Sequence, residues 1–263
     1  MPNLKINRIH KLVKTAQTAL KKKTNGGVIY LLPQMLVKII YLVPLMYIWK
    51  TLIESGATAD LTLTQLLTYS YLNALLSDIL VVDTFINEWD AAGKCLNLFT
   101  RPMSVYWQVI SRTVGEWVPT LLMFSLPMAL LAPFFGIEIL PKSLWVIPSL
   151  FLCASLGFAL EFLFFCITLR LQNVVWLTWV IRTAIVSFFS GSVIPFKILP
   201  FGMDRWMAFQ PFGSLGGAFL SLYVGAGEPS QIIPLQIIWN IIFWLAALFF
   251  FEKSRERMVS FGG

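Results

Sequence analysis

Long apolar stretches separated by short polar connections run through most of the chain. Six of these stretches cover residues of about 28–49, 63–85, 106–135, 144–169, 174–194 and 232–251. A helix needs about 20 apolar residues to cross the hydrocarbon core of a bilayer, and each stretch is about that long or longer. The pattern therefore predicts an all-α integral membrane protein with six transmembrane helices.

A closed barrel is the other architecture that can span lipid. Its strands alternate apolar and polar residues over about ten positions. The segment from Ile237 to Phe251 does not alternate in this way, so helices are the better interpretation.

Residues 1–27 follow a different pattern. Basic residues occur throughout, at Lys5, Arg8, Lys11, Lys14, Lys21, Lys22 and Lys23, and apolar residues recur near helical spacing. We expect an amphipathic interfacial helix that lies on an anionic membrane surface. The next apolar run is long and lacks a small-residue cleavage site, which excludes a signal peptide. The expected organisation is this helix at 1–27, a transmembrane domain at 28–252 and a cytoplasmic tail at 253–263.

Composition narrows the class of protein further. The 263 residues are 57% hydrophobic and only 13% charged, whereas soluble domains carry roughly 25% charged residues. The single histidine is His10, and the cysteines Cys95, Cys153 and Cys166 are scattered without a CxxC pair. These counts argue against a metal site, a Ser-His-Asp enzyme and a disulfide framework.

The basic residues are distributed unequally between the connections. If the N-terminus is cytoplasmic, Lys94, Arg101, Arg170, Lys253, Arg255 and Arg257 join the seven of the N-terminal stretch on the inside, against Lys50, Lys142, Lys197 and Arg205 outside. This asymmetry predicts that both termini face the cytoplasm, with an even number of spans. Nucleic-acid binding is the weaker explanation of the net charge of +7, because the basic residues lie next to the spans.

The cytoplasmic connection after the second span reads as a short amphipathic helix at about 87–100. Its candidate docking residues are Glu88, Asp90, Gly93, Leu96, Leu98, Phe99, Arg101 and Pro102. Such a helix can lie in a groove of a cytoplasmic partner. The alternative is an ordinary solvated loop.

A second unusual segment, at about 195–215, lies between the fifth and sixth spans. It holds three prolines among bulky apolar residues, and its marked positions are Gly191, Pro195, Pro200, Trp206, Pro211 and Phe212. Interrupted backbone at membrane depth must be packed in protein or line water. We expect a re-entrant or interfacial pair of short helices on the outer side; an aromatic surface loop is the alternative.

Ionisable residues also fall within the spans or at a span edge, at Lys38, Asp78, Arg112, Glu116, Glu161 and Arg182. Such residues are costly in lipid and usually face a bundle interior or a water-filled path. Arg112 and Glu116 are four residues apart and can pair on one helix face. The set is either a translocation path or proton relay, or a group of structural ion pairs.

Together these segments resemble the permease subunits of type-2 ABC exporters, in a six-helix branch often encoded as two permease genes with one ATPase gene. The residues that carry the resemblance are Leu61-Thr-Leu-Thr-Gln-Leu-Leu-Thr-Tyr69, Gly93, Leu98 with Arg101-Pro102, Ser190-Gly191, Ile194-Pro195, Leu199-Pro200, Pro211-Phe212 and Phe261-Gly-Gly263. The loop before Leu61 departs from that branch because it lacks the usual Gly-aromatic pair.

The resemblance implies a subunit of the inner (cytoplasmic) membrane that pairs with a second permease, identical or paralogous, among membrane lipids. Two copies of an ABC ATPase would bind below, with ATP and Mg on the ATPase, and residues 88–99 would be the coupling helix. The chain itself has no phosphate loop, because Gly93-Lys94 is followed by Cys95 and Glu88 stands five positions before Gly93. It is therefore expected to be a transport subunit and not an enzyme.

The apolar, aromatic character suits an amphiphilic cargo such as a peptide, lipid or drug. An ion-coupled secondary transporter is the rival hypothesis, although the two halves show no inverted repeat.

Overall fold

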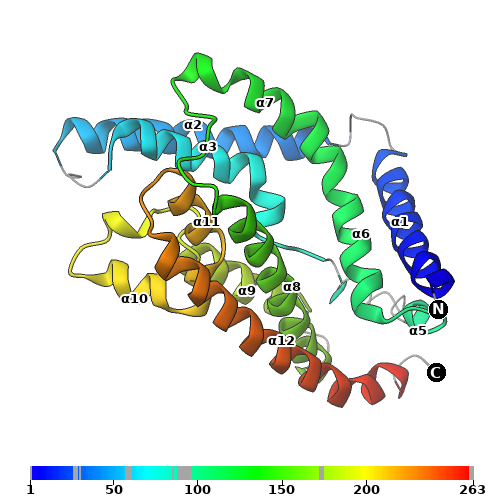
Figure 1. The fold of residues 1–263 in the computed structure, drawn as a ribbon. Helices are drawn as coiled ribbons and strands as arrows, with labels where there is room; N and C mark the ends of the chain where they lie inside the picture. Colours follow the sequence, from blue (N-terminus) through cyan, green and yellow to red (C-terminus); the bar gives the residue numbers. More distant parts are fainter. Residues whose placement is uncertain are drawn as a thin grey trace.

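A computed structural model describes residues 2–25, 29, 31–56, 61–84, 86–87, 96–171 and 175–260. Throughout these residues the regular structure is helical, and they contain no strand. The predicted all-α class is therefore confirmed. The helices are α1 Pro2–Thr24, α2 Leu32–Glu54, α3 Leu63–Leu80, α5 Leu96–Phe99, α6 Val105–Thr120, α7 Leu126–Leu131, α8 Val146–Leu171, α9 Val175–Phe189, α10 Met203–Phe209, α11 Gly216–Tyr223 and α12 Pro229–Ser260 (Figure 1).

Four helical segments are long and apolar enough to cross a membrane: Leu32–Glu54, Val105–Phe135, Val146–Leu171 and Pro229–Ser254. They correspond to the first, third, fourth and sixth predicted spans. The second and fifth predicted spans are helices that do not meet the same standard. α3 carries Thr, Ser, Tyr, Asn and Asp side chains over 18 residues, and α9 has 15 residues, about 22 Å of helix.

The weak apolar character of α3 follows from its position in the bundle. Tyr69, Ser70 and Tyr71 are buried inside the protein, and their polar atoms find protein partners. A helix enclosed by neighbouring helices does not need a uniformly apolar surface. Hydropathy therefore identifies lipid-facing helices better than it identifies this interior one.

The third predicted span is continuous but irregular. A π-helical turn, Leu121–Ser125, joins α6 to α7, and a 3₁₀ turn, Ala132–Phe135, ends the segment. Pro119 and Pro127 flank the π turn. Each proline removes one backbone donor, and the wider turn accommodates the resulting irregularity.

α8 lies at the centre of the bundle and packs along α12, with α3 and α11 also against it. Its residues Cys153, Leu156 and Phe165 are fully buried. Gly157 allows the closest approach, because a Cβ atom there would lie 2.6 Å from the Val82 side chain.

α1 packs lengthwise on α6 (Figure 1). A Cβ atom on Gly115 would lie 2.2 Å from the carbonyl oxygen of Ala16, so the two backbones are in direct contact. Lys11, Lys14, Lys21 and Lys22 are exposed, whereas Lys23 donates to the backbone oxygen of Glu116 at 2.8 Å. Part of the apolar side that was expected to rest on the membrane surface is thus covered by α6, whereas Ile9 and Val13 remain exposed.

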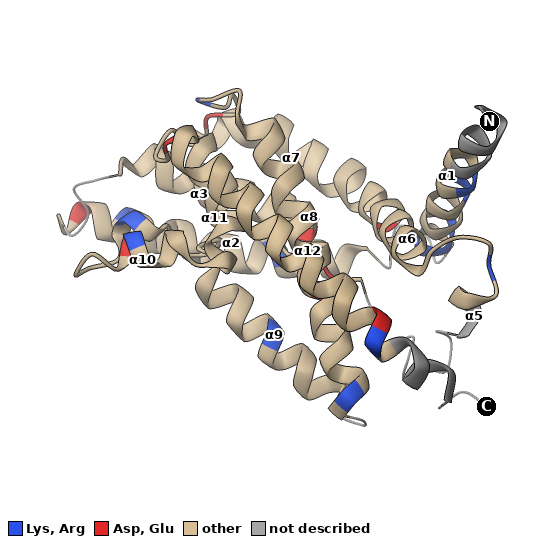
Figure 2. Ribbon diagram, turned by 60° about the horizontal axis from the view of Figure 1, so that its bottom comes forward, with Lys and Arg blue, Asp and Glu red and all other residues tan. Residues whose placement is uncertain are grey.

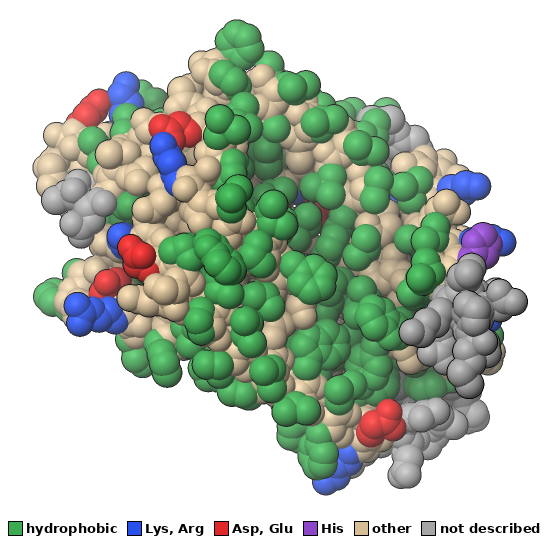
Figure 3. All heavy atoms as spheres, viewed as in Figure 1, with side chains coloured by type: hydrophobic (Ala, Val, Ile, Leu, Met, Phe, Trp, Pro, Cys, Tyr) green, Lys and Arg blue, Asp and Glu red, His purple; other side chains and the backbone are tan. Residues whose placement is uncertain are grey.

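Charged side chains gather at two ends of the molecule. The N-terminus, α5 and the C-terminus lie at one end, and α10 lies at the other (Figures 1 and 2). Apolar side chains cover the face between the ends (Figure 3). Phe134, Tyr41 and Phe151 are 84%, 75% and 75% exposed. Apolar surface of this extent suits contact with lipid, and the protein is a membrane protein by this criterion.

Candidate functional site

The chain leaves helical geometry directly after α3. Val81 has φ −123° and ψ 83°, and residues 81–84 form neither helix nor strand. Val82 and Thr84 are each 1% exposed. Buried backbone outside regular structure needs other hydrogen-bond partners, so the partners of this segment define the site.

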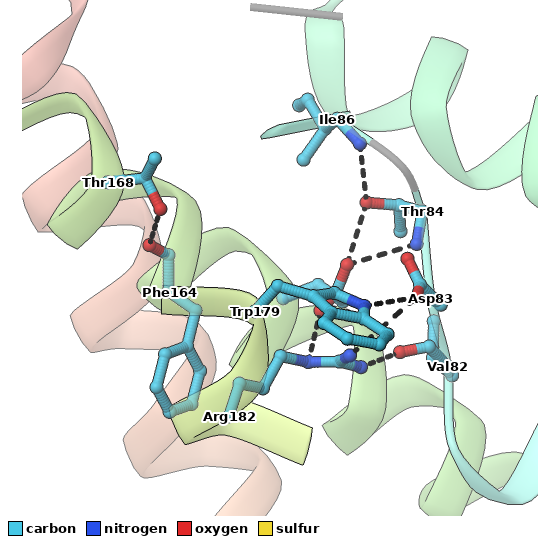
Figure 4. A network of polar contacts seen from close by, with 9 residues as sticks. Val82, Asp83, Thr84, Ile86, Phe164, Thr168, Trp179 and Arg182 are labelled. Carbon is cyan, nitrogen blue, oxygen red and sulfur yellow. Dashed lines mark hydrogen bonds and ion pairs between the residues drawn. The ribbon is translucent and has the colours of Figure 1, made fainter. Parts of the chain in front are cut away.

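Side chains of α8 and α9 supply these partners (Figure 4). Glu161 of α8 accepts from the Thr84 backbone N–H at 3.0 Å and from the Thr84 hydroxyl at 2.9 Å, both through Oε2. The Thr84 hydroxyl oxygen also accepts from the Ile86 N–H at 3.4 Å. The non-helical segment is thereby connected to α8 through one carboxylate.

Arg182 of α9 joins the same network through its guanidinium group. It forms an ion pair with Oε1 of Glu161 and donates a short hydrogen bond to the Val82 carbonyl. A longer contact of 3.9 Å reaches the carboxylate of Asp83, which also accepts from the Trp179 indole at 3.3 Å. Arg182 thus contacts three groups, the Val82 carbonyl and the carboxylates of Glu161 and Asp83.

Local helix geometry brings these residues onto the correct faces. Gly157 and Glu161 are four residues apart on α8, so the space at Gly157 admits Val82 on the side where Glu161 reaches Thr84. Trp179 and Arg182 are three residues apart on α9 and both reach Asp83. Arg182 and Glu161 are 4% and 2% exposed, so their pairing offsets the cost of burying two charges.

The predicted coupling segment is described only in its second half. Leu96 begins α5, Leu98 and Phe99 are half-buried, and Arg101 and Pro102 are exposed. Glu88, Asp90 and Gly93 lie outside the described residues.

Gln108 of α6 holds this second half in place. Its amide nitrogen donates to the backbone oxygens of Leu98 at 2.7 Å and Met103 at 2.8 Å. A pocket of about 200 Å³ lies beside the segment, lined by residues that include Arg101, Tyr106 and Glu252. This pocket therefore lies between the end of α5 and α12.

The other sequence-predicted charges also form ion pairs. Lys38 of α2 contacts Asp78 of α3 at 2.9 Å and lies over the Phe124 ring at 5.4 Å. Arg112 contacts Glu116 at 2.8 Å within α6. With Glu161 and Arg182, the six charges that the sequence singled out form Lys38–Asp78, Arg112–Glu116 and Glu161–Arg182.

The predicted outer segment contains α10 and two 3₁₀ turns and ends just before α11. Pro195 precedes the first turn and Pro211 begins the second, with Phe212 packed on the main core cluster. Pro200 and Trp206 are exposed, whereas Gly191 is buried and accepts from the Tyr69 hydroxyl at 2.5 Å. This hydrogen bond joins the residues that directly follow α9 to α3.

Sequence reasoning missed several of the residues that make these connections. Asp83, Thr84 and Trp179 complete the buried network, and Gln108 and Gln210 bind backbone carbonyls. Gln210 donates to the carbonyl of Phe189 at 2.6 Å, which joins α9 to the outer segment. The sequence signal for these residues is a polar side chain next to a break in an apolar run. This signal marks the residue but does not identify its partner.

Models of known protein families, characterised proteins and solved structures give no match to this chain. Within the described part of the chain, no three His, Cys, Asp or Glu side chains are grouped as metal ligands would be. The arrangement holds non-helical backbone between helices through the side chains of Glu161 and Arg182.

Proposed function

We propose that this chain is the membrane-spanning permease subunit of an ATP-driven ABC exporter. The observation that carries the proposal is the position of the connection between α3 and α6. Its α5 segment lies at the same end of the molecule as both termini (Figure 1). A short helix between two membrane helices at a basic end is suited to dock on a cytoplasmic partner.

In this proposal six helical segments cross the inner membrane: α2, α3, α6 with α7, α8, α9 and α12. α3 is enclosed by protein, and α9 is extended by the buried stretch at Ser190 and Gly191. Both termini face the cytoplasm, and the segment of about 195–215, which contains α10, forms the outer re-entrant hairpin. The basic residues at the end that carries the termini favour this orientation.

The N-terminal helix keeps an interfacial position because the helix beside it is longer than the membrane. Val105–Phe135 has 31 residues, about 46 Å of helix, against a hydrocarbon core of about 30 Å. Gln108, Arg112 and Glu116 all lie in its first half. The beginning of α6 therefore extends beyond the core on the cytoplasmic side, and α1 packs along α6.

The chain supplies the path, and a separate ATPase supplies the energy. A second permease, identical or paralogous, completes the path, and two ATPase subunits bind ATP and Mg. Closure of the ATPase pair would push the α5 segments and switch the permease interface as a rigid-body change. An amphiphilic peptide, lipid or drug is the expected cargo, because a path between such apolar subunits is open to lipid.

The charged residues bear on the rival proposal, an ion-coupled secondary transporter. Each of the six is engaged in an ion pair between or within helices. Such pairing supports a structural role over an ion path. Transport that continues without ATP and collapses with an uncoupler would favour the rival.

The test begins with purification of the chain from its own cells in mild detergent. An ABC ATPase and a second permease copy should co-purify, and failure to find an ATPase would contradict the proposal.

Glu88→Lys with Asp90→Lys should insert normally, yet lose roughly tenfold or more of ATP-dependent transport of a fluorescent phospholipid in proteoliposomes while ATP hydrolysis continues. The matched control reverses Asp204 and Glu228 at the opposite end and should keep transport. Normal transport by the first double variant would refute the coupling role.

A further inference from the structure

The non-helical segment at residues 81–84 is the covalent link between α3 and the connection that carries α5. The Val81 N–H still donates to the Ser77 carbonyl of α3 at 2.9 Å, whereas the next polar groups of the segment are bound by α8 and α9 side chains. The Val82 carbonyl is held by Arg182, and the Thr84 N–H and hydroxyl are held by Glu161. Displacement of the connection therefore acts first on these bonds.

Arg182 is the shared member of the network. One guanidinium contacts a backbone carbonyl of the segment, a carboxylate of α8 and, at 3.9 Å, the carboxylate of Asp83. A planar guanidinium presents several donors in a fixed geometry, whereas a lysine ammonium is a single point charge. The arrangement thus depends on the shape of the arginine side chain as well as on its charge.

Packing around Arg182 makes the contact stiff. Arg182 is 4% exposed, Glu161 2%, and Val82 1%. Val82 also lies against Gly157, where no space remains for a Cβ atom. A tightly packed group with discrete partners passes on a displacement instead of absorbing it.

We propose that Arg182 is a positioning residue that, with Glu161, anchors residues 81–84 to α8 and α9 and passes displacement of the α5 connection to α9. Anchoring stands on the contacts alone. The passing of displacement rests on the proposed function, since a partner must move the connection.

Hydrogen exchange on the full chain in detergent micelles tests the anchoring. Arg182→Lys keeps the charge but not the fork of donors, and it should raise amide exchange of peptides covering 82–87 roughly tenfold, without a change in α12. Arg182→Gln should raise it further. The control, Lys38→Gln, removes another ion pair within the bundle and should leave 82–87 unchanged. Normal exchange in Arg182→Lys, or equal exchange in the control, would overturn the anchoring.

The second measurement uses the complex with its ATPase. A spin label on Phe188→Cys, at an exposed α9 position, is placed in a chain whose three cysteines are replaced by serine. Its spectrum should change when ATP and Mg are added, and Arg182→Lys should abolish that change while ATP hydrolysis continues. A preserved response in Arg182→Lys would overturn the transmission. If no ATPase co-purifies, both the proposed function and the passing of displacement to α9 are refuted. Hydrogen exchange still tests the anchoring of residues 81–84, because that experiment needs no ATPase.

Discussion

Contact between α1 and α6 depends on a single residue without a side chain. Gly115 faces the Ala16 backbone, where an added Cβ would lie 2.2 Å from the carbonyl oxygen and 2.7 Å from the Cα atom. Backbone cannot move aside as a flexible side chain would. The pairing of these helices therefore depends on Gly115.

Gly115→Ala should separate α1 from α6 and destabilise the protein by about 1–3 kcal/mol, as overpacking generally does. Tryptic cleavage after Lys21, Lys22 and Lys23 should become faster, and the Tm in detergent should fall. Val114→Ala, at the neighbouring and 41% exposed position, is the control and should change neither quantity. Unchanged cleavage in Gly115→Ala would contradict the close packing.

The irregular helix formed by α6, the π turn and α7 is held by α3 through hydrogen bonds. Ser125 donates to the Leu75 carbonyl at 2.6 Å, and the Tyr71 hydroxyl donates to the Met128 carbonyl at 2.5 Å. The Ala132 N–H turns to Ala129, so Tyr71 replaces the bond that a regular helix would give Met128. α3 thus stabilises the shape of its neighbour.

Tyr71→Phe should leave the Met128 carbonyl without this donor and cost about 1–3 kcal/mol. Hydrogen exchange should increase in residues 126–135, and thermal unfolding in detergent should begin at a lower temperature. Tyr41→Phe removes the same hydroxyl from a 75% exposed residue and serves as the control. Equal effects of the two variants would show that the Met128 contact contributes nothing specific.

The whole molecule has two polar ends separated by an apolar surface. Both termini and α5 share one end, whereas α10 lies at the other end (Figure 2). Exposed apolar side chains across the middle suit contact with the lipid of a bilayer, where their exposure has no free-energy cost. They do not suit contact with water.

Single cysteines introduced at His10, Lys142 and Asp204 in a cysteine-free chain should report this topology. An impermeant maleimide should label positions 142 and 204 in intact cells, and position 10 only after the cells are opened. Phe165→Cys, at a fully buried position, should remain unlabelled in both samples. Labelling of position 10 in intact cells would reverse the proposed orientation.

The sequence by itself determined the helical class, the approximate position of the long apolar helices and the unequal distribution of basic residues. These properties depend on local pattern, because every lipid-facing residue meets the same apolar solvent and every backbone group must be bonded within its own helix. The same reasoning expected α3 and α9 to equal the other spans. The structure does not confirm this expectation for α3, whose hydropathy is lower because the helix faces protein and not lipid.

Only the tertiary structure decided which charges meet. Arg112 and Glu116 share one helix, so their spacing alone predicted a pair. Lys38 and Asp78 come from different helices, as do Arg182 and Glu161, and this second pair binds the non-helical residues Val82 and Thr84. A buried ion pair between helices depends on the packing of the whole bundle, since each partner must be brought within a few ångströms and shielded from water. No local pattern carries that information, and the anchoring of residues 81–84 by Arg182 therefore became visible only in the folded chain.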